Sequence, residues 1–201
     1  VSYLQFILPG LLMMGVIMSA YSNTSFSLYI AKFQGSIQEL MVSPMSYWEI
    51  IFAITIGGVF RGMLVGLGIL VVGILFAHVT IHSIFILLFF ILMVSLLFSF
   101  AGIATALWGN NFDQMNVFAT FLITPLTYLG GVFYSITMLP PFWATLARFN
   151  PILYMVDGFR YGFIGVTDVP LRYSLILVLV LTLFFFFLCV HMFRIGYKLR
   201  T

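Results

Sequence analysis

Few residues in this chain have the types and spacing that catalysis or metal binding requires. Cys189 and His191 lie two residues apart in an apolar run, so a helix directs them to different faces and they form no nucleophile and base pair. His78 and His82 have helical i, i+4 spacing, but no third ligand lies near them in the sequence. The sequence therefore predicts neither an enzyme nor a metal site.

Nucleotide and nucleic-acid binding also lack their usual signals. The sequence contains no Gly-x-x-x-x-Gly-Lys-Ser/Thr loop, so we expect the chain to bind neither ATP nor any other cofactor by itself. The eight Lys and Arg residues are scattered and form no basic stripe of the kind that nucleic acid requires. Any energy that the chain uses must therefore come from elsewhere.

The composition is that of a polytopic membrane protein. Hydrophobic residues make up 63% and charged residues 6% of the 201 residues, and the mean hydropathy is +1.21. A soluble domain carries roughly 25% charged residues. We therefore expect an all-α membrane helix bundle in a single domain, residues 1–201. Because the chain begins with Val1 and not Met, we also expect it to lack an N-terminal part.

Five apolar segments approach the roughly 20 residues that cross a bilayer as a helix. These predicted spans are residues 3–21, 48–76, 84–108, 115–134 and 173–193. In the fourth, Pro125 predicts a kink and the pair Gly130 and Gly131 loosens the far end. In the second, Gly58, Gly62 and Gly66 lie four apart and permit close approach of another helix.

Arg61 also lies inside the second predicted span, where an unpaired charge costs roughly 3 kcal/mol or more. We therefore expect Arg61 to face the bundle or a wet cavity. Asp113 and Asn110 are its candidate partners, and such a pair would gate the inner half of a path through the bundle.

The stretch 32–49 is the longest polar interruption in the first half of the chain. Two Ser-x-x-Glu capping boxes, Ser36 with Glu39 and Ser46 with Glu49, predict two helix starts. Pro44 ends the first helix early, because the residue before a proline avoids the α region. The apolar residues of this short helix share one face, which predicts a contact surface for a partner. They are Ile37, Leu40 and Met41.

The segment 139–165 is divided by prolines and glycines into pieces too short to span. We expect two short helices, 142–149 and 152–164, that lie at the membrane interface or dip into it. Asp157 and Arg160 have the i, i+3 spacing of an ion pair on one helix face.

Charge gives only a slight bias in orientation. One side collects Lys32 and three cations of the C-terminal tail, and the other collects three arginines. The first set is Lys32, Arg194, Lys198 and Arg200, and the second is Arg148, Arg160 and Arg172. Because three cations cluster at the end of one span, we place that end in the cytoplasm.

Two runs of sequence resemble a known family. They are KFQGSIQELMVSP at 32–44 and a longer run that comprises TPLTYLGGVFYS at 124–135, LPPFW at 139–143 and NPILYMVDGFRYG at 150–162. Both resemble the type-2 ABC exporter permeases, and more narrowly the bacterial inner-membrane branch that includes drug, nodulation-factor and polysaccharide exporters.

This resemblance implies six spans with both ends cytoplasmic, of which five are present here. It implies a coupling helix at about 35–43 that docks on a separate ATPase subunit, which uses ATP and Mg²⁺, and external helices at about 139–165. It also implies a homodimer of permeases, between which an amphipathic, lipid-like, drug-like or saccharide substrate passes. The coupling residues are Gly35, Ser36, Ile37, Glu39, Leu40, Met41 and Pro44. The candidates for translocation or gating are Arg61, Asp113, Pro125, Gly130, Gly131, Asp157 and Arg160.

An ion-coupled secondary transporter or a channel-like protein is the alternative from another class. Such proteins place ionisable groups near the midplane of several spans. Here only Arg61 and, nearer a span end, His191 meet that description. The sequence does not separate residues that line a path from residues that face lipid.

Overall fold

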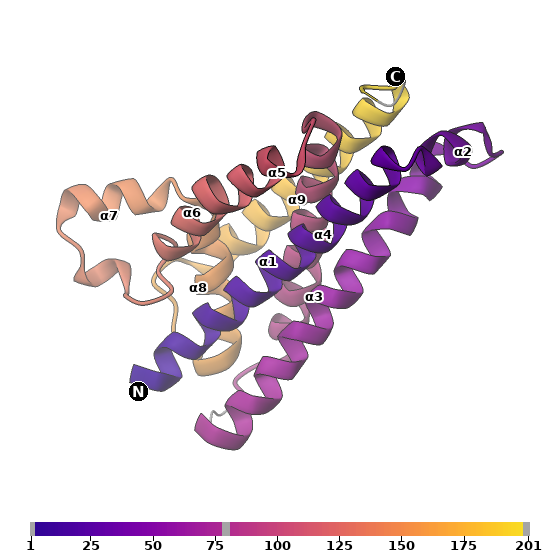
Figure 1. Ribbon diagram of the computed structural model, residues 1–201. Coiled ribbons are helices and arrows are strands. Elements are labelled where there is room, and N and C mark those ends of the chain that lie inside the picture. The colour runs from indigo at the N-terminus through magenta and orange to yellow at the C-terminus, as the bar shows by residue number, and fades with distance from the viewer. Residues whose placement is uncertain (1–2, 78–80, 199–201) are drawn as a thin grey trace.

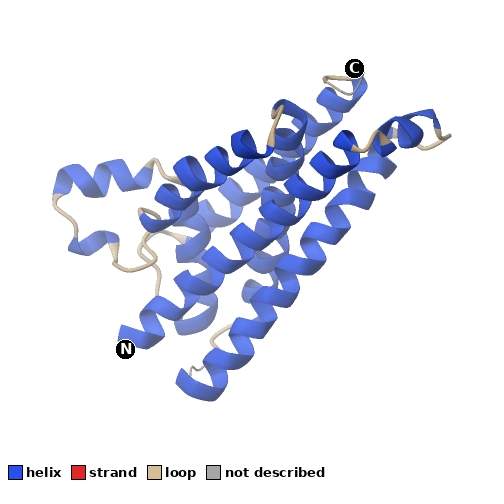
Figure 2. Ribbon diagram, in the orientation of Figure 1, coloured by secondary structure: helices blue, strands red, loops and turns tan. Residues whose placement is uncertain are grey.

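The computed structural model describes residues 3–77 and 81–198, and within these ranges the secondary structure is entirely helical (Figures 1 and 2). The predicted pair His78 and His82 is therefore not tested, since His78 lies outside the described residues. The side chains of Leu40 and Met41 lie outside them as well.

Four helices of the described part are long and apolar enough to cross a membrane. They are α1 (Tyr3–Phe33), α3 (Tyr47–Ala77), α4 (Ile84–Trp108) and α9 (Leu171–Arg194). The predicted spans at 48–76, 84–108 and 173–193 match three of them within two residues at each end. The predicted span 3–21 is wrong at its end, because α1 continues to Phe33.

The extra length of α1 follows from where its polar residues point. Thr24 and Ser25 are fully buried, and the Thr24 hydroxyl donates to the carbonyl of Ala20 at 3.1 Å. A hydroxyl bonded to its own helix satisfies itself without leaving the apolar interior. The polar run at 22–25 therefore does not end the helix.

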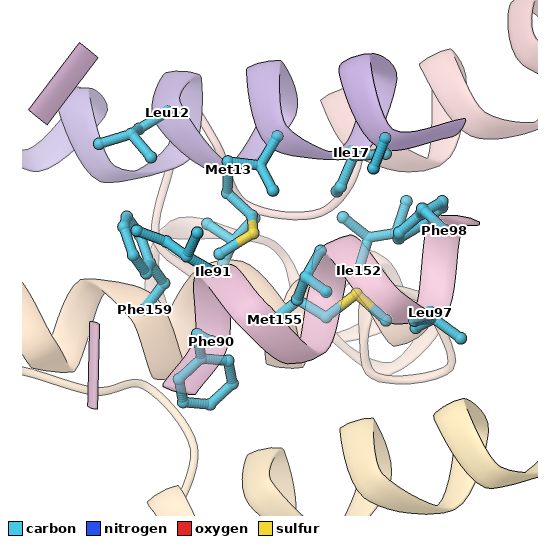
Figure 3. Packing of buried hydrophobic residues seen from close by; sticks show 14 of the residues in the cluster. Leu12, Met13, Ile17, Phe90, Ile91, Leu97, Phe98, Ile152, Met155 and Phe159 are labelled. Atoms are coloured by element: carbon cyan, nitrogen blue, oxygen red, sulfur yellow. The ribbon is translucent and has the colours of Figure 1, made fainter. Parts of the chain in front are cut away.

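Helix α1 lies at the centre of the bundle and packs against α3 and α4 (Figure 1). Gly58, Gly62 and Gly66 of α3 face side chains of α1 and α4, so the predicted glycine face is confirmed as a site of close helix packing. The main hydrophobic core is formed by side chains of α1, α4 and a further helix, α8 (Pro151–Ile164). Figure 3 shows Met13, Ile91 and Met155 among the side chains that meet there.

The fourth predicted span, 115–134, forms a segmented helical stretch instead of one long helix. It consists of α5 (Phe112–Phe118), a π-helical turn (Ala119–Ile123) and α6 (Thr124–Tyr128). It begins earlier than predicted because Asn111 caps it, accepting a hydrogen bond from the Gln114 amide at 2.9 Å. It ends at Tyr128, six residues earlier than predicted.

The end of this stretch and its interior break have identifiable causes. Gly131 has φ of +75°, a left-handed conformation that continues no right-handed helix. Pro125 has no N–H to offer to the preceding turn, and the hydroxyl of Thr124 bonds instead to the carbonyl of Ala119 at 3.0 Å. The predicted irregularity at Pro125 therefore takes the form of a π-helical turn directly before it.

Three shorter elements complete the described chain. α2 (Ser36–Val42) lies between α1 and α3, at the same end of the bundle as the C-terminus (Figure 1). A 3₁₀ turn (Ile136–Met138) and α7 (Pro141–Arg148) extend away from the bundle at the other end. The predicted helices at 142–149 and 152–164 correspond to α7 and α8. α8 dips fully into the bundle, because it packs against α1, α4 and α9.

Candidate functional site

The predicted coupling segment begins with a sharp turn. Gly35 has φ of +78° and occupies the position before α2, where no side-chain cap is present. The hydroxyl of Ser36 reaches back to the carbonyl of Ala31 at 3.1 Å. The predicted capping box of Ser36 with Glu39 is therefore wrong, because the glycine turn already redirects the chain and the hydroxyl is used to tie α2 to α1.

The second predicted capping box is confirmed. The Ser46 amide donates to the Glu49 carboxylate at 2.7 Å, and the Glu49 amide donates to the Ser46 hydroxyl at 3.4 Å. This reciprocal pair satisfies two of the amides that a helix start leaves free. It fixes the start of α3 at Tyr47, after a four-residue link from the end of α2 at Val42.

The apolar face of α2 does not point where the sequence predicts. Ile37 is 1% exposed and packs in a core with Leu28, Tyr29 and Ile51. The predicted place of Ile37 in a contact surface is therefore wrong in this structure, because its side chain anchors α2 to the bundle. Glu39 and Pro44 are exposed at this end of the molecule.

The carbonyls at the C-terminal end of α4 are held by two lysines beside α2. Lys32 Nζ donates to the carbonyls of Leu107 and Gly109, each at 3.4 Å. Lys198 Nζ donates to the Trp108 carbonyl at 2.7 Å and to Asn110 Oδ1 at 2.9 Å. Cations are favourable at helix C-termini, where carbonyls are free and the dipole is negative. Hydrogen bonds from these two lysines thus connect α1, α4 and the C-terminal tail at the α2 end of the bundle.

Arg61 does not lie where the sequence predicts. It is exposed on the outer side of α3, and no ion pair of Arg61 occurs among the residues that the structure describes. Asp113 is exposed at the start of α5, and the Asn110 side chain accepts from Lys198 instead. The predicted pairing of Arg61 with Asp113 or Asn110 is therefore wrong, because both lie at the end of the bundle while Arg61 lies in the middle of a helix.

At the opposite end, Asp157 and Arg160 of α8 form the predicted ion pair, with Nη1 and Oδ1 3.9 Å apart. Both residues are almost fully buried, at 1% and 2% exposed. The two oxygens of Asp157 also accept the amides of Asp168 at 2.8 Å and Val169 at 3.1 Å. Burial raises the pKa of the Asp157 carboxyl, and these two hydrogen bonds oppose the rise.

Arg160 joins three separate parts of the chain. Its Nη2 donates to the carbonyl of Gly131 at 2.5 Å, and its guanidinium lies 4.0 Å from the centre of the Phe6 ring of α1. A cation over an aromatic face is attracted by the ring quadrupole. Arg160 therefore ties α8 to α1 and to the loop after α6, the loop in which Gly130 and Gly131 were predicted to matter.

Ser135 and Asp168 complete the network around Asp157 and Arg160, which is called the outer network below. Asn150 forms separate hydrogen bonds at the same end of the bundle. The sequence analysis missed all three residues. Asp168 accepts from the Ser135 hydroxyl at 2.6 Å and from the Ile136 amide at 3.0 Å. Asn150 donates to the Leu126 carbonyl at 2.6 Å and accepts the Ile152 amide at 3.0 Å. Asn150 before Pro151 is a recognisable helix cap. No sequence signal relates Ser135 to Asp168, which lies 33 residues away.

A cavity of about 770 Å³ opens beside this network, between α7, α8 and the start of α9. Arg148, Tyr154 and Asp168 line its polar end, and Ile176 and Val180 line an apolar side. Among the described residues that line this cavity, no nucleophile and base meet.

Long apolar helices, with a short helix at one end of the bundle and a buried α8 at the other, define a polytopic helical membrane protein. Residues 1–164 match the ABC-2 type transporter family, and the chain belongs to that family. The chain is 44% identical over 200 residues to the inner membrane transport permease YadH of Escherichia coli strain K12, covering all of this chain and 78% of that protein.

Nodulation protein J of Rhizobium leguminosarum bv. trifolii is a more distant relative. It is 25% identical over 170 residues, which cover 82% of this chain and 63% of that protein. The chain is thus the membrane subunit of an ABC transporter and a multi-pass protein of the inner membrane. Its family implies an ABC ATPase as partner.

Proposed function

We propose that the chain is the permease of an ABC exporter, that it works as a homodimer, and that a separate ATPase subunit using ATP and Mg²⁺ drives it. The observation that carries this proposal is α2: a short helix with the exposed carboxylate of Glu39, anchored from below by buried Ile37. Such a helix receives force from a docked subunit without unfolding, because its inner face is part of the core.

The connections of α2 provide a route for that force. Gly35 turns the chain directly from α1 into α2, and the Ser46 and Glu49 box starts α3 after a link of only four residues, 43–46. α1 and α3 pack against each other along much of their lengths. A tilt of α2 therefore moves two spans as a pair.

The outer network is the natural counterpart of the coupling helix. α1 reaches from α2 at one end to Arg160 at the other, since its Phe6 ring contacts that guanidinium. We place α2 on the cytoplasmic side, because Lys32 and Lys198 lie there and positive charge favours that side. The closed network of Asp157, Arg160 and Asp168 then caps the path on the outer side, and opening it releases an amphipathic substrate outward.

The test is a charge reversal, Glu39→Arg, in permease reconstituted with its ATPase. Glu39 is exposed, so folding should be unchanged while ATPase association and ATP-dependent transport fall by about tenfold, which corresponds to roughly 1.4 kcal/mol of docking energy.

The matched control is Arg172→Glu, an exposed charge reversal at the other end of the bundle. It should leave ATPase association unchanged. Undiminished association of the Glu39→Arg variant would contradict the coupling role of α2. Transport that continues in vesicles without the ATPase would contradict the ABC mechanism and favour an ion-coupled carrier.

A further inference from the structure

The cavity beside the outer network has a charged end and an apolar wall. Its volume of about 770 Å³ lies within the range of roughly 300–1,000 Å³ that is usual for ligand pockets. Arg148 of α7 and Asp168 of the loop after α8 line the charged end, and one face of α9 forms the wall. The apolar residues of this wall are Ile176, Leu177, Val180 and Leu181. A ligand that matches the cavity is therefore charged at one end and apolar at the other.

A second, smaller cavity adjoins this wall. It has a volume of about 190 Å³ and is lined by α4, α8, α9 and the segmented stretch 112–128. Leu181 lines both cavities, and Phe185, one turn further along α9, lines the second. Every residue that lines the second cavity is apolar. Apolar cavities of about 150 Å³ stay dry and bind small apolar molecules such as benzene, so this space suits hydrocarbon and not water.

The two cavities follow α9 in the direction of one bilayer leaflet. The charged end lies at the start of α9, where a membrane span meets the lipid headgroups, and the apolar part lies further along the helix. Tyr173 lines the first cavity and Phe185 the second, 12 residues or about 18 Å apart along the axis. Half of the hydrocarbon core measures about 15 Å. A lipid of this leaflet therefore fits along α9 in its normal orientation.

The charges at the polar end are opposite in sign and lie on elements that are tied to the bundle. Oδ2 of Asp168 accepts hydrogen bonds from the Ser135 hydroxyl and the Ile136 amide, which hold the carboxylate in place. The Tyr154 hydroxyl donates to the Arg148 carbonyl at 2.9 Å and connects the end of α7 to α8. A cation and an anion fixed on separate elements complement a headgroup that carries both charges.

We propose that the larger cavity binds a phospholipid whose headgroup carries a primary amine, with its phosphate at Arg148 and its ammonium at Asp168. A hydrocarbon chain of this lipid follows α9 into the smaller cavity past Leu181. A primary ammonium donates hydrogen bonds to a carboxylate, whereas a trimethylammonium group has no N–H to donate. The lipid is a constituent of the membrane that stays bound, so the inference does not depend on what the permease transports.

The experiment uses full-length permease, stripped of lipid in dodecyl maltoside, with native mass spectrometry as the readout. The probes are dioleoyl phosphatidylethanolamine and dioleoyl phosphatidylcholine, and the parent should bind the first several-fold more tightly. Arg148→Gln should weaken binding of both lipids by about tenfold, because both carry the phosphate. Asp168→Asn should abolish the preference, since the amide oxygen still accepts from Ser135 but carries no charge. Arg194→Gln, an exposed arginine at the other end of α9, is the matched control.

A pair of neighbouring substitutions tests where the chain lies. Val180→Phe fills part of the larger cavity and should weaken binding several-fold, whereas Leu179→Phe, at a position of α9 outside the lining, should bind as the parent does. Equal binding by these two variants would overturn the proposal. So would the absence of lipid binding by the parent, because another part of the protein then fills the cavity. Equal affinity of the parent for the two lipids would overturn the recognition of the amine. No ATPase is present, so failure here is distinguishable from failure of coupling at Glu39.

Discussion

The carboxylate of Asp157 is 1% exposed, yet it accepts two backbone amides and an ion pair from Arg160. A buried ion pair contributes little net stability compared with apolar residues of the same size. Removing one partner is costly, because the other charge is left buried alone. The end of the bundle opposite α2 is therefore sensitive to this one residue.

We predict that Asp157→Asn lowers the free energy of unfolding by about 3 kcal/mol or more, within the range for a broken buried pair. The measurement is equilibrium unfolding in mixed micelles. Arg172→Gln is the control, because Arg172 is exposed and forms no such pair in the described structure. Replacing Asp157 and Arg160 together by leucine should cost less than Asp157→Asn alone. A loss below about 1 kcal/mol in Asp157→Asn would show that the pair does not hold this end.

At the scale of the elements, the segmented stretch 112–128 ends where Gly131 adopts a left-handed conformation. A Cβ atom at Gly131 would lie 3.0 Å from Leu153 Cδ1, so the position is both strained and crowded for any other residue. Gly68, in contrast, is a helical glycine of α3 with no atom within 4 Å of its Cβ position. Gly131 is therefore required by its backbone conformation, whereas Gly68 occupies an ordinary helical position that other residues can adopt.

Gly131→Ala should lower the free energy of unfolding by about 1–2 kcal/mol for the left-handed backbone alone. The matched substitution Gly68→Ala should raise it by about 0.5–1 kcal/mol, because alanine is the better helix residue. Thermal unfolding of both variants in the same detergent provides the comparison. An equal response at the two positions would mean that the end of the stretch does not depend on the conformation of Gly131.

Much of the element pattern could be predicted from the sequence, because local residues define it. α4 begins and ends as predicted, between the polar residues around Ser83 and Gly109. The end of α1 could not be predicted, since hydropathy does not show that Thr24 points into the bundle and bonds to its own helix. The inward side of Ile37 depends on tertiary packing in the same way.

The candidate site was predictable only where its residues are close together in the sequence. The pair Asp157 and Arg160 has helical spacing, so the sequence reveals it. Ser135 and Asp168 meet only through the folding of two loops, which no local pattern encodes. The position of Arg61 relative to Asp113 also needs the structure, because no local pattern shows that Asp113 lies at the end of the bundle while Arg61 lies in the middle of α3.

At the scale of the whole molecule, α1 connects the two candidate functional ends. Its 31 residues extend about 46 Å, and Phe6 at the outer network lies about 39 Å along the helix from Lys32 at the α2 end. The proposed mechanism requires these ends to lie on opposite sides of the membrane. Gln34, next to α2, and Thr145, on α7, are exposed at the two ends and report on the two sides.

The chain is well suited to a labelling test, because Cys189 is its only cysteine and is 0% exposed. We predict that a membrane-impermeant maleimide labels Thr145→Cys in intact spheroplasts but labels Gln34→Cys only after permeabilisation. The parent protein, with Cys189 alone, should remain unlabelled in both conditions and is the control. The reverse pattern would invert the proposed orientation and place α2 out of reach of a cytoplasmic ATPase. Labelling of both positions in intact spheroplasts would mean that the two ends of the bundle do not lie on opposite sides of the membrane.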